Sequence, residues 1–192
     1  LAMLGVTAGG VFVMSTLIGL ISAGIDEKLV ELRKGRSQVL ETGHTVILGW
    51  SEQIFTIISE LAEANANQPK QCIAILADRD KVEMEDDIRA KVANLGRTRV
   101  VCRSGSAIEP ADLAIVSLDT ARSIIILSHN GDDPDSTVIK TLLAIINNPQ
   151  RRAEPYHIVA ELHDPQNVEV VQVATRGEAE MVLSGDLIAR II

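Results

Sequence analysis

The sequence predicts an α/β protein with a doubly wound, mostly parallel sheet of six strands, preceded by one transmembrane helix. Two observations predict the sheet. Short apolar runs alternate with helical segments between residues 44 and 192, and runs such as SIIIL are apolar without interruption. Such runs are typical of parallel strands that helices cover on both faces. A third observation, the absence of charged side chains from residues 1–25, predicts the membrane helix.

Residues 1–25 (LAMLGVTAGGVFVMSTLIGLISAGI) form the apolar start of the chain. A helix needs about 20 mostly apolar residues to cross a bilayer, and this run is long enough. A signal peptide would have a basic start and a shorter apolar stretch. The five glycines of the run are also compatible with a buried core helix, but its length favours a transmembrane helix.

Residues 26–43 are expected to form a linker. Three acidic residues dilute the local charge, but the basic side chains that follow the apolar run are typical of a cytoplasmic flank: Lys28, Arg33, Lys34 and Arg36. We therefore expect a membrane protein whose residues 26–192 are cytoplasmic. The chain begins at Leu1 and its last expected helix stops at Ile192, so we interpret it as a truncated part of a longer protein.

Residues 44–192 are expected to form the domain itself, and the spacing of their apolar residues predicts its elements. The expected strands are Thr45–Leu48, Cys72–Ala77, Arg99–Cys102, Ser123–Ser128, His157–Leu162 and Met181–Leu183. The expected helices are Glu52–Ala66, Asp80–Leu95, a short one near Pro110–Val116, Asp135–Asn147, Pro165–Thr175 and one that begins at Asp186. Ser51 is placed to cap the first helix. Strands that alternate with helices in this way build a Rossmann-like sheet.

Composition and charge exclude several classes of function. The formal net charge of −8 argues against a nucleic-acid partner, which needs a basic surface to neutralise phosphates. The two cysteines, Cys72 and Cys102, form no C-x-x-C pair, and we expect free thiols at opposite ends of neighbouring strands, in a reducing compartment. The four histidines lie far apart and have no metal-binding spacing.

The ligand site of such a sheet is predictable from topology. Ligands bind beyond the carboxyl ends of the strands, where the first and fourth strands diverge. This rule selects four loops without any motif: Gly49–Glu52, Asp78–Asp80, Arg103–Ser106 and Ser128–Asp135.

A dinucleotide is the first candidate ligand. Gly49 provides the turn after the first strand, Trp50 and Ser51 follow it, and the helix behind them offers free N–H groups to a phosphate. Asp78, at the end of the second strand, is placed to accept hydrogen bonds from ribose hydroxyls.

Three side chains argue against a dinucleotide. Ser51 and Ile54 stand where the G-x-G-x-x-G motif has its second and third glycines. Glu52 would repel a phosphate by about 0.3–1 kcal/mol. The motif is therefore a weak indication of NAD.

A phosphate clamp is a further feature of these loops. Arg79 and Arg103 follow the second and third strands, and two guanidinium groups there would bind a phosphate in bidentate fashion. Ser104, Gly105 and Ser106 would add backbone and hydroxyl donors. The alternative, equally open, is that the arginines pair with nearby carboxylates: Asp78, Asp80 or Glu109.

A divalent cation is the other candidate ligand. The segment HNGDDPDS gathers Asp132, Asp133 and Asp135 after the fourth strand, and calcium prefers such oxygen ligands. Alternatively, Asp133 or Asp135 only begins the helix beside Pro134.

Catalysis finds little support in the sequence. No histidine is placed to activate Ser104 or Ser106, and Ala160 stands four residues after Tyr156, where short-chain dehydrogenases have a lysine. We therefore expect a protein that is not an enzyme.

Several stretches together resemble one family. DEKLVELRKGRSQVLETGHTVILGWSE, LADRDKVEMEDDI and VVCRSGSAIEPADLAIVSLDTARSIIIL occur in this order and cover much of the chain. They are similar to the Castor/Pollux ion channels of plant symbiosis and their bacterial relatives. The motifs Gly-Trp-Ser, Cys-Arg-Ser-Gly-Ser and Leu-Arg-Lys-Gly are not general features of Rossmann-like folds.

The resemblance implies a tetrameric cation channel whose cytoplasmic domains, of the type that regulates potassium conductance, form a gating ring. Residues 1–25 would then be the end of the pore-lining inner helix, residues 26–43 the linker, and residues 44–192 the regulatory domain. It also implies an effector, calcium or a nucleotide such as NAD or ATP. The alternative is an NAD-dependent oxidoreductase or a peripheral nucleotide-binding subunit of a potassium transporter.

Overall fold

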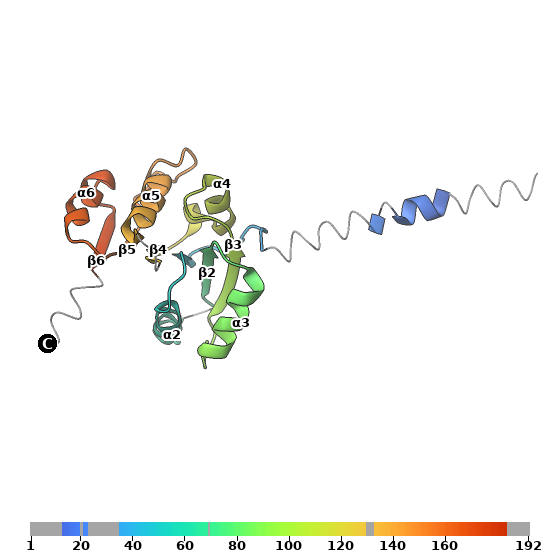
Figure 1. Cartoon of the computed structure of the whole chain (residues 1–192). Helices are drawn as coiled ribbons and strands as arrows, with labels where there is room; N and C mark the ends of the chain where they lie inside the picture. Colours follow the sequence, from blue (N-terminus) through green and yellow to red (C-terminus); the bar gives the residue numbers. More distant parts are fainter. Residues whose placement is uncertain (1–12, 20, 23–34, 69, 130–132, 184–192) are drawn as a thin grey trace, which may run out of the picture.

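The computed structural model describes residues 13–19, 21–22, 35–68, 70–129 and 133–183 (Figure 1). The strands are β1 Thr45–Leu48, β2 Cys72–Ala77, β3 Arg99–Ser104, β4 Ser123–Ile126, β5 Ile158–Leu162 and β6 Ala179–Leu183. The helices are α2 Ile54–Ala64, α3 Lys81–Lys91, α4 Pro110–Leu113, α5 Pro134–Ile146 and α6 Gln166–Ala174, with two short 3₁₀ turns, η1 Ala114–Val116 and η2 Leu118–Thr120.

The six strands form one sheet in the order β3-β2-β1-β4-β5-β6. Every neighbouring pair is parallel. Strand β1 lies between β2 and β4, so the order of the strands reverses at β1 and places a switch point at its carboxyl end. The predicted doubly wound, parallel six-strand fold is confirmed.

Helices cover both faces of the sheet (Figure 1). Helices α2 and α3 lie on one face, and α4, α5 and α6 lie on the other. Side chains of β1 alternate between two apolar clusters, since Val46 and Leu48 belong to the cluster beneath α5 while Ile47 belongs to the cluster beneath α2. All three are fully buried. Each such side chain stabilises the fold by roughly 1.5–3 kcal/mol, so a charged residue at one of these positions would disrupt the layer that it faces.

Helix starts differ from the sequence prediction by at most two residues, and one expected N-cap is absent. Asp80 caps α3 as its position indicates, because its carboxylate accepts hydrogen bonds from the N–H groups of Val82 at 2.8 Å and Glu83 at 3.2 Å. The expected cap by Ser51 is not formed. Helix α2 begins at Ile54, and its N-cap residue, Gln53, makes no side-chain hydrogen bond. The turn after β1 delays the helix beyond the reach of Ser51.

The two cysteines are free, as predicted. Cys72 pairs with Arg99 and Cys102 with Ile75, so the thiols lie three residues apart along the strands and belong to different apolar clusters. Burial raises the pKa of Cys72 to about 11 and that of Cys102 to about 12. Both thiols therefore stay protonated and unreactive.

The N-terminal helix is described only in part, over residues 13–19 and 21–22. Within the described part of the chain, no helix combines the length and apolar character that crossing a membrane requires. The predicted membrane helix over residues 1–25 falls largely outside the described residues and stays a prediction. The helix expected from Asp186 lies wholly outside them.

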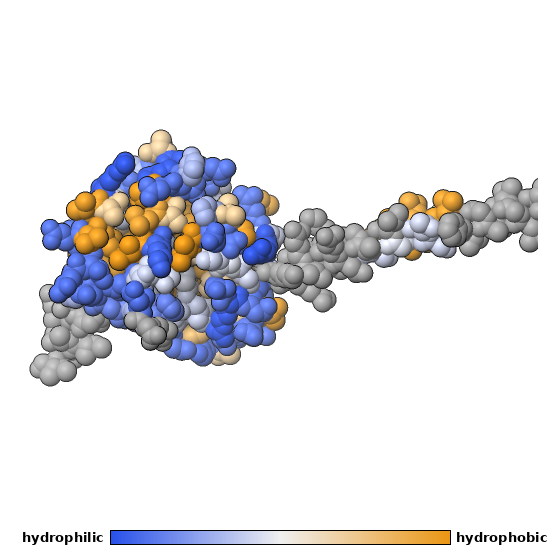
Figure 2. Space-filling model, turned by 45° about the horizontal axis from the view of Figure 1, so that its top comes forward, coloured by the Kyte–Doolittle hydropathy of each residue, from blue (hydrophilic) through white to orange (hydrophobic). Residues whose placement is uncertain are grey.

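An apolar patch covers the side of the domain that carries α5 and α6 (Figure 2). Three large apolar side chains of α5 and α6 are exposed: Leu143, Val170 and Val173. A group of this kind on one face marks a contact surface more often than scattered single residues do.

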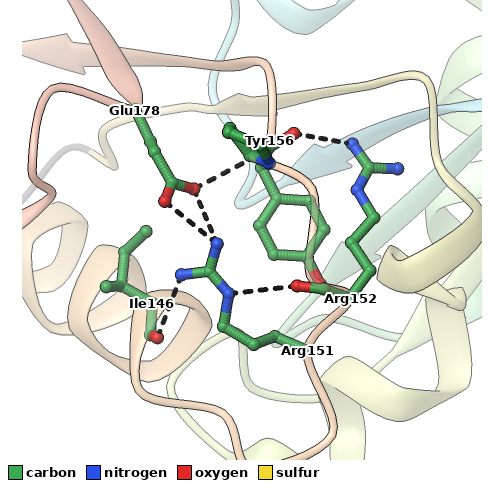
Figure 3. A network of polar contacts seen from close by, with 6 residues as sticks. Ile146, Arg151, Arg152, Tyr156 and Glu178 are labelled. Atoms are coloured by element: carbon green, nitrogen blue, oxygen red, sulfur yellow. Dashed lines mark hydrogen bonds and ion pairs between the residues drawn. The ribbon is translucent and has the colours of Figure 1, made fainter.

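Two arginines and a glutamate join the loops that precede β5 and β6 (Figure 3). Arg151 donates two hydrogen bonds to the carboxylate of Glu178, at 3.0 and 2.9 Å, and the Tyr156 N–H donates a third at 3.1 Å. Arg152 donates to the carbonyl of Ala121 at 2.9 Å. Both guanidinium groups lie over the Tyr156 ring, 5.2 and 4.7 Å from its centroid. The network therefore fastens the β6 end of the sheet to the segment before β4.

The charge of Glu178 depends on this network. Burial alone would raise the pKa of Glu178, but the hydrogen bonds from Tyr156 and Arg151 and the charges of Arg151 and Arg176 outweigh burial and lower it. A carboxyl group whose pKa is lowered on folding stabilises the fold fully above its unfolded pKa, and this contribution is lost as pH falls through the folded pKa.

We predict that Glu178→Gln lowers the free energy of unfolding by about 1–3 kcal/mol near pH 7, because a half-buried charged acceptor is lost. The difference from the wild type should stay constant above about pH 6 and shrink below about pH 4, since the unfolded pKa is near 4.3. Urea unfolding at a series of pH values measures it. The control is Glu180→Gln, an exposed neighbour outside the network, which should change stability by no more than about 0.5 kcal/mol. Equal costs in the two variants would contradict the prediction.

Candidate functional site

The turn after β1 requires glycine. Gly49 has a φ of +92°, and a Cβ atom there would lie 2.7 Å from the carbonyl oxygen of Leu127. Its N–H donates to the carbonyl of Leu76 at 2.9 Å. Gly49 is therefore fixed between the ends of β2 and β4, at the switch point of the sheet.

Trp50 forms an aromatic wall directly after this turn. The carbon of the Arg79 guanidinium lies 5.1 Å from the centroid of its ring, and Phe55 meets it edge to face with centroids 5.7 Å apart. Arg79 is itself paired with Asp87 at 2.9 Å and with Glu83 at 3.6 Å. The indole is thus held from two sides, by α2 and by the loop after β2.

The start of α2 is open to an anion. Helix α2 has no side-chain cap, and the hydroxyl of Ser51 is buried without a hydrogen-bond partner among the described residues. Uncapped N–H groups at a helix start attract phosphate or carboxylate. Glu52 repels an anion less than its charge suggests, because the Lys91 ammonium lies 3.2 Å from its carboxylate.

The loop after β2 supplies a free carboxylate and an engaged arginine. Asp78 is exposed, and within the described ranges it makes no hydrogen bond or ion pair. Arg79 pairs with Glu83 and Asp87 rather than with any of the three carboxylates considered from the sequence. Asp78 is therefore available to a ligand. Arg79 supports the cavity mainly by packing on Trp50.

The end of β3 faces the linker. Arg103 donates from Nε to the carbonyl of Ser37 and from Nη1 to the carbonyl of Cys102, the latter at 2.8 Å. Burial lowers the pKa of Arg103, although an arginine keeps its charge under such shifts. The hydroxyl of Ser104 is buried and has no partner in the part of the chain that the structure describes, and the Gly105 N–H donates to the carbonyl of Ala77 at 3.0 Å.

A cavity of about 610 Å³ opens at the carboxyl ends of these strands, within the size range of small-molecule sites. We call it the switch-point cavity. Five of the predicted residues line it: Gly49, Trp50, Ser51, Asp78 and Arg79. Arg103, Ser104 and Gly105 are not among its lining residues.

Three further lining residues belong to the loops that the topological rule selected: Glu52, Ser106 and His129. The others lie outside those loops: Leu76, Ala77, Ala107, Ile108 and Thr137. Of these, Thr137 lies in the first turn of α5, beyond the loop that the topological rule selected. Extending each loop to the first turn of the following helix would have included it. Ala107 and Ile108 directly follow the selected loop Arg103–Ser106.

The acidic segment after β4 is occupied by structural contacts. Asp132 lies outside the described residues. Asp133 caps α5 by accepting from the Ser136 N–H at 3.2 Å. Asp135 is buried and accepts three hydrogen bonds, from the N–H groups of His163 and Asp164 and from the Asn167 amide, at 2.8, 3.0 and 2.8 Å.

The carboxylate of Asp135 has no need of a cation. Burial alone would raise the pKa of Asp135, but the three hydrogen bonds outweigh burial and lower it. Across the described ranges, no group of three His, Cys, Asp or Glu residues is placed to hold a metal ion. The calcium site over Asp132, Asp133 and Asp135 stays a prediction.

Comparisons with known proteins identify relatives over the whole chain. The probable ion channel CASTOR of Oryza sativa subsp. japonica is 36% identical over 100% of the chain, which covers 22% of that protein. The probable ion channel POLLUX of Arabidopsis thaliana is 37% identical over 97% of the chain, which covers 23% of that protein. The resemblance to the Castor/Pollux ion channels is confirmed. No family model matches the chain.

Solved structures share the fold. A GsuK channel bound to NAD aligns with 85% of the chain and 25% of its own, with a TM-score of 0.57 and 19% identity. GsuK bound to ADP aligns with 82% of the chain and 36% of its own, with a TM-score of 0.54 and 20% identity. The chain spans only about a fifth of the length of its curated relatives.

We predict that Gly49→Ala lowers the free energy of unfolding by about 2–4 kcal/mol, because the new Cβ combines an unfavourable φ with a backbone clash. Urea unfolding measures the cost, and Trp50 emission reports the local change. Gly96→Ala is the matched control, since Gly96 also has a positive φ, +55°, but a Cβ atom there would meet no described atom within 4 Å. It should cost only about 1 kcal/mol. Equal costs would contradict the proposed approach to Leu127.

Proposed function

Because the chain resembles Castor/Pollux-type ion channels over its whole length, we propose that it forms the ligand-sensing part of a tetrameric cation channel. Residues 1–25 supply the end of the pore-lining inner helix, residues 26–43 the linker, and residues 44–192 one domain of a cytoplasmic gating ring. The transported ions are cations. Binding of an effector to the domain changes ion conduction through the linker.

The switch-point cavity carries this proposal. It combines a free carboxylate at Asp78, an uncapped helix start at α2 and a buried hydroxyl at Ser51 that no described residue engages. These groups suit the ribose and the phosphates of a nucleotide. We propose NAD or an adenine nucleotide as the effector, with Asp78 accepting from ribose hydroxyls and Ser51 and the N–H groups of α2 donating to phosphate.

The surroundings of Glu52 favour the same ligand. In the sequence, Glu52 is a lone carboxylate next to the phosphate position, whereas in the fold Lys91 lies 3.2 Å away and offsets its charge. The pair is exposed and its own energy is small. The local repulsion of a phosphate is nevertheless reduced, which removes one of the objections to a nucleotide.

Calcium is the second candidate effector, at Asp132, Asp133 and Asp135. Asp133 caps α5 and Asp135 accepts three hydrogen bonds, so a calcium ion would have to compete with these contacts. We therefore place calcium after a nucleotide.

In a ring of several copies, weak effector sites are sufficient to couple effector binding to ion conduction. An effector shifts a conformational equilibrium only by its preference for one state, and a tenfold preference corresponds to about 1.4 kcal/mol per site. Four sites acting together multiply this preference. The exposed apolar side chains of α5 and α6, among them Val170 and Val173, suit contacts between copies.

An enzyme or a transporter subunit remains the alternative function. His129 is the one histidine among the described residues that line the cavity, and it is the candidate acid or base for an NAD-dependent oxidoreductase. If absorbance measurements showed that the protein oxidises NADH in the presence of added substrates, this alternative would be favoured. The upstream sequence of the same gene distinguishes a channel from a peripheral nucleotide-binding subunit of a potassium transporter, because only the channel has a pore loop.

We predict that ADP or NAD changes the fluorescence of Trp50, the sole tryptophan of the chain, in a saturable titration. Asp78→Asn should weaken the affinity about 5- to 15-fold, because it replaces a charged acceptor with a neutral one. Asp119→Asn, an exposed aspartate outside the cavity, should leave the affinity unchanged. Ion conduction of the full-length protein in bilayers, with and without the nucleotide, tests the functional consequence.

A flat titration with ADP, ATP, NAD and NADH would refute the nucleotide. A response to calcium alone would support the second candidate. Equal loss of affinity in Asp78→Asn and Asp119→Asn would show that the cavity is not the site.

A further inference from the structure

One wall of the switch-point cavity is a loop whose neighbouring residues also contact the segment before β1. The loop between β3 and α4, residues 105–109, contributes Ser106, Ala107 and Ile108 to the cavity. On both sides of this loop, Arg103 and Asp112 contact the segment 35–39 that precedes β1. We call residues 35–39 the linker segment. The same loop therefore borders the ligand and the linker.

Arg103 is the first contact between them. Its guanidinium donates to the carbonyl of Ser37 and, at 2.8 Å, to the carbonyl of Cys102 in its own strand. A planar fork that donates in two directions fixes the linker segment relative to the end of β3. The side chain is half-buried, so solvent competes poorly for these donors.

Asp112 is the second contact. One oxygen of its carboxylate accepts from the Ser106 N–H at 2.8 Å, and the other lies 3.8 Å from a guanidinium nitrogen of Arg36. Ser106 lines the cavity, whereas Arg36 belongs to the linker segment. A single carboxylate thus bridges the cavity wall and the linker.

Close packing limits how this carboxylate moves. A Cβ atom on Gly105 would lie 2.8 Å from the Asp112 carboxylate, and one on Gly35 would lie 3.0 Å from the side chain of Lys81. Further along, the Val39 N–H donates to the carbonyl of Ile115 at 2.7 Å, and its carbonyl accepts from the Ser117 hydroxyl at 2.6 Å. The linker segment is therefore held at several points.

We propose that Arg103 and Asp112 couple the occupancy of the switch-point cavity to the position of the linker segment, without contacting the ligand themselves. This proposal rests on the proposed nucleotide site and assigns its regulation. A ligand that shifts the loop at Ser106 changes the position of the Asp112 carboxylate and, through Arg36 and Ser37, the linker segment. Arg103 is thereby a positioning residue and not a phosphate clamp.

The test separates binding from transmission in the full-length protein. ADP and NAD affinities are measured by calorimetry, and hydrogen exchange of the amides of residues 36–43 is measured with and without nucleotide. The variants are Arg103→Gln, Asp112→Asn and Gly105→Ala, the last of which pushes the Asp112 carboxylate away. Arg97→Gln removes an exposed arginine near β3 that makes no hydrogen bond or ion pair among the described residues, and it is the charge-matched control.

We expect Arg103→Gln to bind nucleotide within about twofold of the wild type, while the nucleotide-dependent change in linker exchange falls at least about fivefold. Gly105→Ala and Asp112→Asn should behave alike, and Arg97→Gln should behave as the wild type. Nucleotide-dependent conduction in bilayers should fall in parallel with the change in exchange.

Two results would overturn the inference while the nucleotide site stands. In the first, the nucleotide-dependent change in linker exchange is the same in all three variants as in the wild type. In the second, Arg103→Gln loses more than about tenfold in nucleotide affinity, which would make Arg103 a ligand contact. Failure of the wild type to bind either nucleotide would refute the proposed function and, with it, this coupling.

Discussion

The end of β1 is the constraint on which the rest of the structure depends. This strand is buried on both faces and paired with β2 and β4, so the chain leaves the sheet at a point that is already enclosed. Gly49 makes this exit possible, because its N–H bonds to Leu76 and its missing side chain leaves room for the carbonyl of Leu127. The same turn directs the chain into α2 and separates the loops after β1 and β4. The turn at Gly49 therefore shapes both the end of the core and the cavity beside it.

Beyond Gly49, the site departs from a glycine-rich phosphate turn. Where such turns bring bare backbone to the ligand, Trp50 supplies an aromatic wall that Arg79 and Phe55 hold in place. The charge of Arg79 is directed to α3, so it adds little attraction for an anion. Recognition of the proposed nucleotide would then depend on backbone N–H groups, on the hydroxyl of Ser51 and on the shape of the cavity.

The sequence predicts the strands well and the side-chain partners poorly, for physical reasons. The runs Thr45–Leu48 and Cys72–Ala77 match the observed strands to the residue, because uninterrupted apolar runs bounded by polar loops have few competing interpretations. Ser51 has the side chain of an N-cap, but the turn geometry that delays α2 is not encoded in residue type. The contact of Arg103 with the carbonyl of Ser37 spans 66 residues of sequence. Every residue has a carbonyl, so no pattern marks this partner.

Ion pairs near the cavity, more than the net charge of the chain, determine how strongly it repels an anion. The net charge of −8 acts at a distance, but salt screens exposed charges beyond about 8 Å at physiological ionic strength. Within that distance, Lys91 offsets Glu52, and the helix start of α2 presents its positive end to the cavity. A cation approaches the acidic surface more easily, yet the carboxylate of Asp135 is already bonded to three protein donors. This arrangement of donors is the reason why we propose a nucleotide rather than a cation as the effector, in spite of the net charge.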